Sequence, residues 1–172
     1  MMLSVVSKAF SRNTFPPASS LRVGCRRNLA VIAQVPKDRV PSQDGDRLVI
    51  HDDGMTGKSL KGPILIAKVS DQYHAIHGIC PHMQKSMERG KIILPNGDGS
   101  SSDPVLRCPV HNTRFNMRTG KCVKWVTGVL GYDNALVGRV AQNIGGVKQD
   151  IPAYTVHVNV DGSLSIDDEI KE

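Results

Sequence analysis

The sequence predicts an all-β fold, an antiparallel sandwich or barrel, from three observations. Short runs with strand character follow one another from residue 47 to residue 166. Gly, Pro, Asn and Asp interrupt these runs, as they do at turns between strands. One run alternates, with Tyr73, Ala75 and His77 on one face and His74 and Ile76 on the other. Many short strands at regular spacing are typical of antiparallel sandwiches and barrels.

Nine runs are expected to form the strands, and two of the turns between them can be recognised. Asp71-Gln72 is expected to be the hairpin turn between the second and third runs. Asp161-Gly162 separates the last two runs. In chain order the runs are 47–51, 63–69, 72–77, 91–94, 105–108, 113–117, 122–125, 154–160 and 164–166.

Two segments do not follow the strand pattern. The polar insert 96–103 is rich in Gly and Ser and predicts an exposed loop. The segment 126–149 predicts a short helical or irregular element, whose surface helix would pack on the sheet. A docking element for a partner or a membrane surface is the alternative. The apolar residues at helical spacing in segment 126–149 are Leu136, Val137, Val140, Ile144 and Val147.

The first 34 residues differ in composition from the rest of the chain. They contain five Lys or Arg, several Ser and Thr, and no Asp or Glu. This composition is typical of an organellar transit peptide, and a basic tail that is never cleaved is the alternative. We therefore expect a disordered transit peptide at 1–34, a linker at 35–46 and one domain at 47–172. The pattern favours the chloroplast, stroma or thylakoid, over the mitochondrion.

The composition also excludes several function classes. The net charge of +6 comes almost wholly from the first 34 residues, which leaves a nearly neutral body. A neutral body with one Trp, three Tyr and three Phe argues against nucleic-acid binding. No apolar stretch is long enough for a transmembrane helix. The chain of 172 residues has no recognisable nucleophile or phosphate loop, so we expect no substrate site of its own.

Two short motifs carry the chemistry. Cys80-Pro81-His82 and Cys108-Pro109-Val110-His111 each offer one thiolate and one imidazole. Two Cys and two His are the ligands of a Rieske [2Fe–2S] centre, in which imidazoles replace two of the thiolates of an all-Cys cluster. A structural zinc ion bound by two Cys and two His is the alternative. Zinc sites more often use a C-x2-C knuckle, so the spacing favours the cluster.

Around these motifs the chain resembles the Rieske ferredoxin-like family, over about residues 48–166. Gly90 stands where the family ends its first cluster loop, and 115–120 match the strand and turn after the second loop. The resemblance implies a β-fold with two cluster-binding loops at one tip. It also implies that Cys80 and Cys108 bind one iron, that His82 and His111 bind the other, and that each subunit holds one [2Fe–2S] cluster.

The departures from the family indicate which kind of member this is. Subunits that oxidise quinols have an extra Cys in each loop, where Lys85 and Val110 stand here. Thr113 and Phe115 occupy the places of a Ser and a Tyr that raise the potential in those subunits. We therefore expect a ferredoxin-type centre of low or middle potential. Asn112 replaces the usual Gly after His111, and Asn tolerates a left-handed backbone.

Residues 121–160 are loosely similar to a plant and algal group of plastid Rieske-domain proteins associated with photosystem II. That similarity implies an electron-transfer or stabilising role beside a photosynthetic complex, with peripheral membrane association. A soluble ferredoxin that supplies a protein redox partner, an oxygenase or a reductase, is one alternative. A docking domain with zinc or without metal is another. Cys122 is interpreted as a buried strand residue, with a redox-sensing thiol as the alternative.

Overall fold

A computed structural model describes residues 31–51, 62–95 and 102–170. The predicted transit peptide up to residue 30 and most of the predicted 96–103 loop lie outside the described residues. The described part is mostly β-structure with one short α-helix, which confirms the predicted fold class. Among these residues, no helix is long and apolar enough to cross a membrane.

Most of the expected strands form, with ends shifted by a few residues. The first half contains β1 (Val31–Val35), the 3₁₀ turn η1 (Lys37–Arg39), β2 (Arg47–Ile50), β3 (Ile64–Val69), β4 (Gln72–His77), β5 (Ile79–Cys80), β6 (Lys85–Ser86) and β7 (Lys91–Ile93). The second half contains β8 (Val105–Arg107), β9 (Arg114–Asn116), β10 (Cys122–Lys124), β11 (Gly128–Val129), β12 (Tyr132–Asp133), α1 (Ala135–Gln142), β13 (Ala153–Val158) and β14 (Leu164–Ile170).

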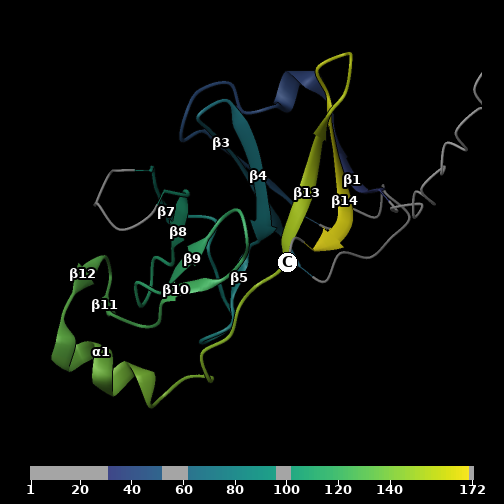
Figure 1. Ribbon diagram of the computed structural model, residues 1–172. Helices are drawn as coiled ribbons and strands as arrows, with labels where there is room; N and C mark the ends of the chain where they lie inside the picture. Colours follow the sequence, from purple (N-terminus) through teal and green to yellow (C-terminus); the bar gives the residue numbers. More distant parts are fainter. Residues whose placement is uncertain (1–30, 52–61, 96–101, 171–172) are drawn as a thin grey trace, which may run out of the picture.

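The strands form two main antiparallel sheets. The larger has the order β1-β14-β13-β4-β3-β2, and the smaller has the order β10-β9-β8-β7. Two short hairpins, β5–β6 and β11–β12, accompany the smaller sheet. Figure 1 shows the larger sheet at the upper right, with β11, β12 and α1 at the opposite, lower left end.

Strand β3 shows how the two faces of the larger sheet are used. Its side chains alternate, so Leu65 packs toward the smaller sheet while Ile64 and Ile66 pack toward β1 and β14. Both faces are covered, and β3 is therefore apolar almost throughout. The core between the sheets contains Leu65, Ala67, Ile76, Cys80, Met87, Leu106, Cys108, Phe115, Met117, Cys122 and Ile151.

Strand β1 corrects the predicted domain boundaries. Residues 31–34 were expected to belong to a disordered transit peptide, but with Val35 they form an edge strand paired with β14. Ile32, Ala33 and Val35 are buried in the second core cluster. The strand was missed because its surroundings have transit-peptide composition, whereas its apolar residues are needed to cover one face of the sheet.

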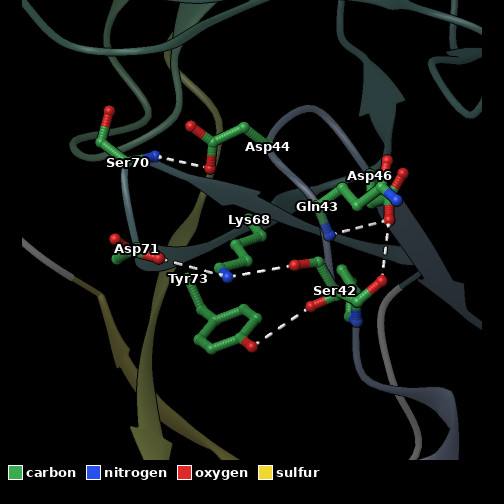
Figure 2. Close-up of polar contacts among 9 residues, drawn as sticks. Ser42, Gln43, Asp44, Asp46, Lys68, Ser70, Asp71 and Tyr73 are labelled. Atoms are coloured by element: carbon green, nitrogen blue, oxygen red, sulfur yellow. Dashed lines mark hydrogen bonds and ion pairs between the residues drawn. The ribbon is translucent and has the colours of Figure 1, made fainter.

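The predicted linker 35–46 is also part of the folded unit. Its loop is fixed to the β3–β4 hairpin, as Figure 2 shows: Lys68 Nζ donates to the Ser42 carbonyl at 3.1 Å, and the Ser70 amide donates to Asp44 at 3.0 Å. The hairpin turn itself is Ser70-Asp71, one residue earlier than predicted. Both residues have positive φ, as a tight two-residue hairpin turn requires.

Helix α1 forms within the segment predicted to be helical, but it buries a different face. Gly138 and Ala141 are its buried residues, while Leu136 is 76% exposed and Val140 63% exposed. The small residues face inward because the backbone of the β11 region approaches closely: a Cβ on Gly138 would lie 3.1 Å from the Val126 carbonyl oxygen. The predicted packing of the large apolar side chains on a sheet is therefore wrong.

Candidate functional site

The first candidate loop lies in the β5–β6 hairpin. Cys80 ends β5 and pairs with Lys85 of β6, so the hairpin encloses residues 81–84. The Met87 amide donates to the Gly78 carbonyl at 2.7 Å and closes the base of the loop. Gly90 follows where the chain passes the β8 backbone, and a Cβ there would lie 2.6 Å from the Arg107 carbonyl oxygen. Only glycine fits such a close approach.

The second loop connects β8 to β9. The Cys108 amide donates to the Thr113 carbonyl at 2.8 Å and closes this loop. Asn112 has a φ of 56°, the left-handed conformation expected for this position. Its side chain is fully buried, and it both accepts from the Gly131 amide at 3.1 Å and donates to Asp133 at 3.0 Å. The β11–β12 hairpin therefore supports the loop from outside.

The two loops bring the two cysteines together in the core. Cys80 and Cys108 are buried and within hydrogen-bonding reach of each other. Their hydrogen bond raises the pKa of Cys80 well above its usual range, and burial adds to this effect. The same bond lowers the pKa of Cys108 to about 6 against the opposing effect of burial. Cys108 therefore becomes a thiolate readily, whereas Cys80 needs a nearby metal cation to favour its thiolate form.

The two loops also bring the side chains of His82 and His111 into contact. Nδ1 of His82 lies 3.2 Å from Nδ1 of His111, and the rings are nearly perpendicular, with centroids 4.8 Å apart. Nε2 of His82 lies 2.9 Å from the Ala141 carbonyl oxygen. Because a carbonyl oxygen only accepts, Nε2 carries the proton and Nδ1 keeps a lone pair. This tautomer can bind a metal through Nδ1.

The distances fit two metal ions, one for each pair. Two nitrogens on one tetrahedral ion lie about 3.3 Å apart, and two thiolates about 3.8 Å apart. The histidine pair matches the first value, and the two cysteine sulfurs are hydrogen-bonded to each other. In the described residues, no group of three or more His, Cys, Asp or Glu surrounds a single ion position. Paired ligands of different type are what a two-iron cluster with mixed ligation requires.

Comparison with known families supports the same conclusion. The family model for the Rieske [2Fe-2S] domain matches residues 40–129, just over half of the chain. The chain belongs to the Rieske [2Fe-2S] domain family. Members of this family bind a [2Fe–2S] cluster, which is accordingly the cofactor of this protein. The predicted fold, family and cofactor are confirmed.

Individual proteins that the chain resembles include a dioxygenase ferredoxin subunit. The chain is 28% identical to the anthranilate 1,2-dioxygenase ferredoxin subunit of Burkholderia cepacia over 86 residues, 48% of this chain and 71% of the relative. A chain in a complex of reduced oxygenase and oxidised ferredoxin of carbazole 1,9a-dioxygenase aligns with a TM-score of 0.53 and 20% identity, covering 84% of this chain and 99% of that one. The ferredoxin of carbazole 1,9a-dioxygenase from Nocardioides aromaticivorans IC177 aligns with a TM-score of 0.50 and 17% identity, covering 80% and 97%. These structures share the fold.

Hydrogen bonds to the two sulfurs come from the loops themselves. The Thr113 hydroxyl and the His82 amide bond to Cys80, and the amides of Val110 and His111 bond to Cys108. Thr113 therefore supplies a side-chain hydrogen bond to a ligand sulfur. Phe115 is fully buried and has no hydroxyl to add another. Such bonds set the potential of an iron–sulfur centre because they stabilise negative charge on sulfur.

The structure shows contacts to His82 that the sequence did not reveal. The Trp125 ring lies edge-on to the His82 ring, with centroids 5.4 Å apart. Ala141 contributes only a backbone carbonyl. Nothing in the local sequence of Trp125 links it to His82. A backbone acceptor has no residue signature, so the contact of Ala141 could not be found from residue types.

The remaining cysteine of the described residues, Cys122, is buried in the core beside the two sheets. Burial raises the pKa of its thiol to about 11. Its amide donates to Asp150 at 2.7 Å, which fixes the start of β10. Cys122 is buried and lies in β10, which confirms its interpretation as a buried strand residue.

Proposed function

We propose that this protein is a Rieske ferredoxin that carries single electrons between protein partners. The observation that supports this most directly is the separation of the four candidate ligands into a Cys80–Cys108 pair and a His82–His111 pair. We assign the cysteines to one iron and the histidines to the other. When bound, the cluster supplies reversible one-electron chemistry. The chain provides the ligands, the hydrogen bonds and the partial exclusion of water.

The surroundings of the site support a carrier role. Thr113 is the single side chain that bonds to a ligand sulfur in the described residues, apart from the cysteines themselves. With Phe115 in place of a hydroxyl-bearing residue, the potential should fall in the lower part of the range of about −150 to +300 mV known for Rieske centres. The similarity to a dioxygenase ferredoxin subunit favours a protein oxygenase or reductase as the partner.

A plastid location remains part of the proposal, on the composition of residues 1–30. These residues are basic, contain several Ser and Thr, and have no acidic side chain. A role beside a photosynthetic complex is the corresponding second candidate. A fluorescent protein carrying residues 1–30 at its N-terminus tests the location by microscopy in plant or algal cells. Fluorescence in mitochondria or in the cytosol would contradict the plastid assignment.

The ligand assignment is tested by metal analysis and spectroscopy of the purified protein. We expect two irons and two acid-labile sulfides per chain, and an EPR signal of the reduced protein with hyperfine coupling to nitrogen. His82→Ala and His111→Ala should each abolish this signal. His51→Ala is the matched control, because its side chain is 63% exposed and its Nε2 lies 3.6 Å from the Glu88 carboxylate, outside both proposed ligand pairs. Zinc in place of iron, or an unchanged signal in either ligand variant, would contradict the proposal.

A further inference from the structure

The two candidate histidine ligands differ in their exposure to solvent. His82 is 3% exposed, whereas His111 is only partly buried. The cover over His82 consists of residues 135–146, that is α1 and the turn that follows it, which we call the α1 cap. It contacts His82 through the Ala141 carbonyl at 2.9 Å from Nε2 and through Gly146, whose amide donates to the His82 carbonyl at 2.8 Å.

The α1 cap presents the negative end of a helix to His82. Helix α1 begins after Asn134, whose side chain accepts from the amides of Leu136 and Val137. It ends at Gln142, so the Ala141 carbonyl belongs to the last turn, where carbonyls lack partners within the helix. That carbonyl accepts from the Ile144 amide and from His82. The carbonyl end of a helix carries a partial negative charge.

Contacts away from His82 hold the α1 cap in place. The Gln142 side-chain amide donates to the carbonyls of Trp125 and Val126 at 3.2 and 3.1 Å. The Asn134 amide donates to the Thr127 carbonyl at 2.9 Å, and Gly138 lies directly against this backbone. Helix α1 is thus fixed to the segment that follows β10. The Ala141 carbonyl therefore has a defined position relative to His82.

We propose that the α1 cap is a positioning element that lowers the reduction potential of the cluster through the hydrogen bond from His82 to the Ala141 carbonyl. This inference rests on the proposed function, in which His82 binds iron through Nδ1. A carbonyl that accepts from Nε2–H makes the imidazole a stronger donor to the metal and fixes the ring orientation. A stronger donor stabilises the oxidised state.

Two further effects act in the same direction. The cluster with its ligands is formally neutral when oxidised and carries one negative charge when reduced. A partial negative charge beside His82 therefore disfavours the reduced state. The α1 cap also excludes water, which would otherwise solvate the negative charge of the reduced state. Removal of the α1 cap should raise the potential by all three effects.

Two adjacent glycines provide a matched test. A Cβ on Gly145 would lie 2.0 Å from Cδ2 and Nε2 of His82, so Gly145→Ala must displace the α1 cap from the ring. A Cβ on Gly146 would meet nothing closer than the Pro81 carbonyl oxygen at 3.2 Å. In purified protein with the cluster in place, we expect Gly145→Ala to raise the midpoint potential and change the EPR g values. Gly146→Ala should leave both close to those of the wild type.

A second variant acts without touching His82. A Cβ on Gly138 would lie 3.1 Å from the Val126 carbonyl oxygen, so Gly138→Val should move the helix away from its support. The proposal requires the potential to rise in this variant too. An unchanged or lowered potential in Gly138→Val would overturn it, whatever Gly145→Ala does. If the wild-type protein lacks the nitrogen-ligated EPR signal, the proposed function itself has failed, which is a different result.

Discussion

The Asn112 side chain donates to Asp133 at 3.0 Å and thereby connects the second ligand loop to the β11–β12 hairpin. The same Asp133 oxygen accepts from the Thr127 hydroxyl at 2.5 Å. The other Asp133 oxygen accepts from Arg114, which is buried, at 2.8 Å. The Asp133 carboxylate therefore connects the second ligand loop, strand β9 and the β11–β12 hairpin by hydrogen bonds. This arrangement makes the geometry of the second loop dependent on a hairpin that contains no ligand.

Replacement of Asn112 by Ala is expected to destabilise the protein by about 2–4 kcal/mol. Two partly buried hydrogen bonds are lost, each worth about 0.5–1.5 kcal/mol. In addition, Ala in the left-handed region costs about 1 kcal/mol. Thermal denaturation followed by circular dichroism, together with loss of the visible absorption of the cluster, measures the effect. Asn112→Gly is the control, because it loses the same hydrogen bonds without the backbone strain. Equal destabilisation of both variants would show that strain at φ 56° contributes nothing.

Asp133 is expected to make stability depend on pH in the acid range. The Thr127 hydroxyl, the Asn112 amide and the nearby Arg114 hold the pKa of this carboxyl below its usual value, against partial burial. A lowered folded-state pKa adds stability above the unfolded value of about 3.9. This stability is lost as the pH falls through the folded-state pKa.

The Asp133 prediction is checked by the rate of thermal cluster loss between pH 7 and pH 3. We expect Asp133→Asn to be less stable than the wild type at pH 7 and to depend less on pH below about pH 4. Asp71→Asn is the control, since that carboxylate is 95% exposed in the β3–β4 turn. If Asp133→Asn retains the full acid dependence of the wild type, other carboxylates must cause it.

Thr113→Val is expected to lower the midpoint potential. The substitution keeps the shape of a fully buried side chain but removes the hydroxyl that bonds to Cys80. Loss of a bond worth about 1 kcal/mol to the reduced state corresponds to about 40 mV for one electron. Redox titration measures the shift. Thr113→Ser keeps the hydroxyl and should stay near the wild-type value; a common shift in both variants would point to packing instead.

Truncation tests whether β1 belongs to the folded unit. A chain beginning at residue 36 loses the buried side chains of Ile32, Ala33 and Val35. Burial of one Ile or Val side chain contributes about 1.5–3 kcal/mol, so the loss should be at least about 3 kcal/mol. A chain beginning at residue 31 keeps β1 and is the control. Equal melting temperatures of the two chains would show that β1 adds no stability.

Local patterns were sufficient to predict most of the structure. Residues 72–77 alternate in sequence and form a strand with the predicted ends, and 105–107 and 114–116 form the strands on either side of the second loop. The proposed ligands could be recognised because Cys and His at short spacing are rare without a metal. Asn112 has the left-handed backbone that the usual Gly at this place in the family indicates and that Asn tolerates.

The features that were missed depend on partners distant in the sequence. Strand β1 is stabilised by β14, more than a hundred residues later, and no local pattern shows this pairing. In α1, the position of Gly138 against a neighbouring backbone decides the buried face, so the apolar spacing of Leu136 and Val140 was misleading. The bond from His82 to Ala141 involves a main-chain oxygen, which every residue possesses.

Replacement of Leu130 by Asn is expected to stabilise the protein. It is the first residue of the two-residue turn between β11 and β12, where its φ is 50° and that of Gly131 is 91°. Such turns favour Asn at this first position because a left-handed backbone strains most side chains. Leu130 is also 74% exposed, so little apolar burial offsets the strain.

Leu130→Asn should therefore raise the free energy of unfolding by about 0.5–1 kcal/mol, measured as a higher melting temperature. The Leu130 amide donates to the Val110 carbonyl at 2.9 Å, and the substitution leaves this backbone bond to the second loop in place. The midpoint potential should consequently stay at the wild-type value. Tyr132→Asn is the control: it is similarly exposed but lies in β12, so relief of turn strain cannot stabilise it. A lower melting temperature for Leu130→Asn would mean that the exposed leucine packs in a way that outweighs its backbone strain.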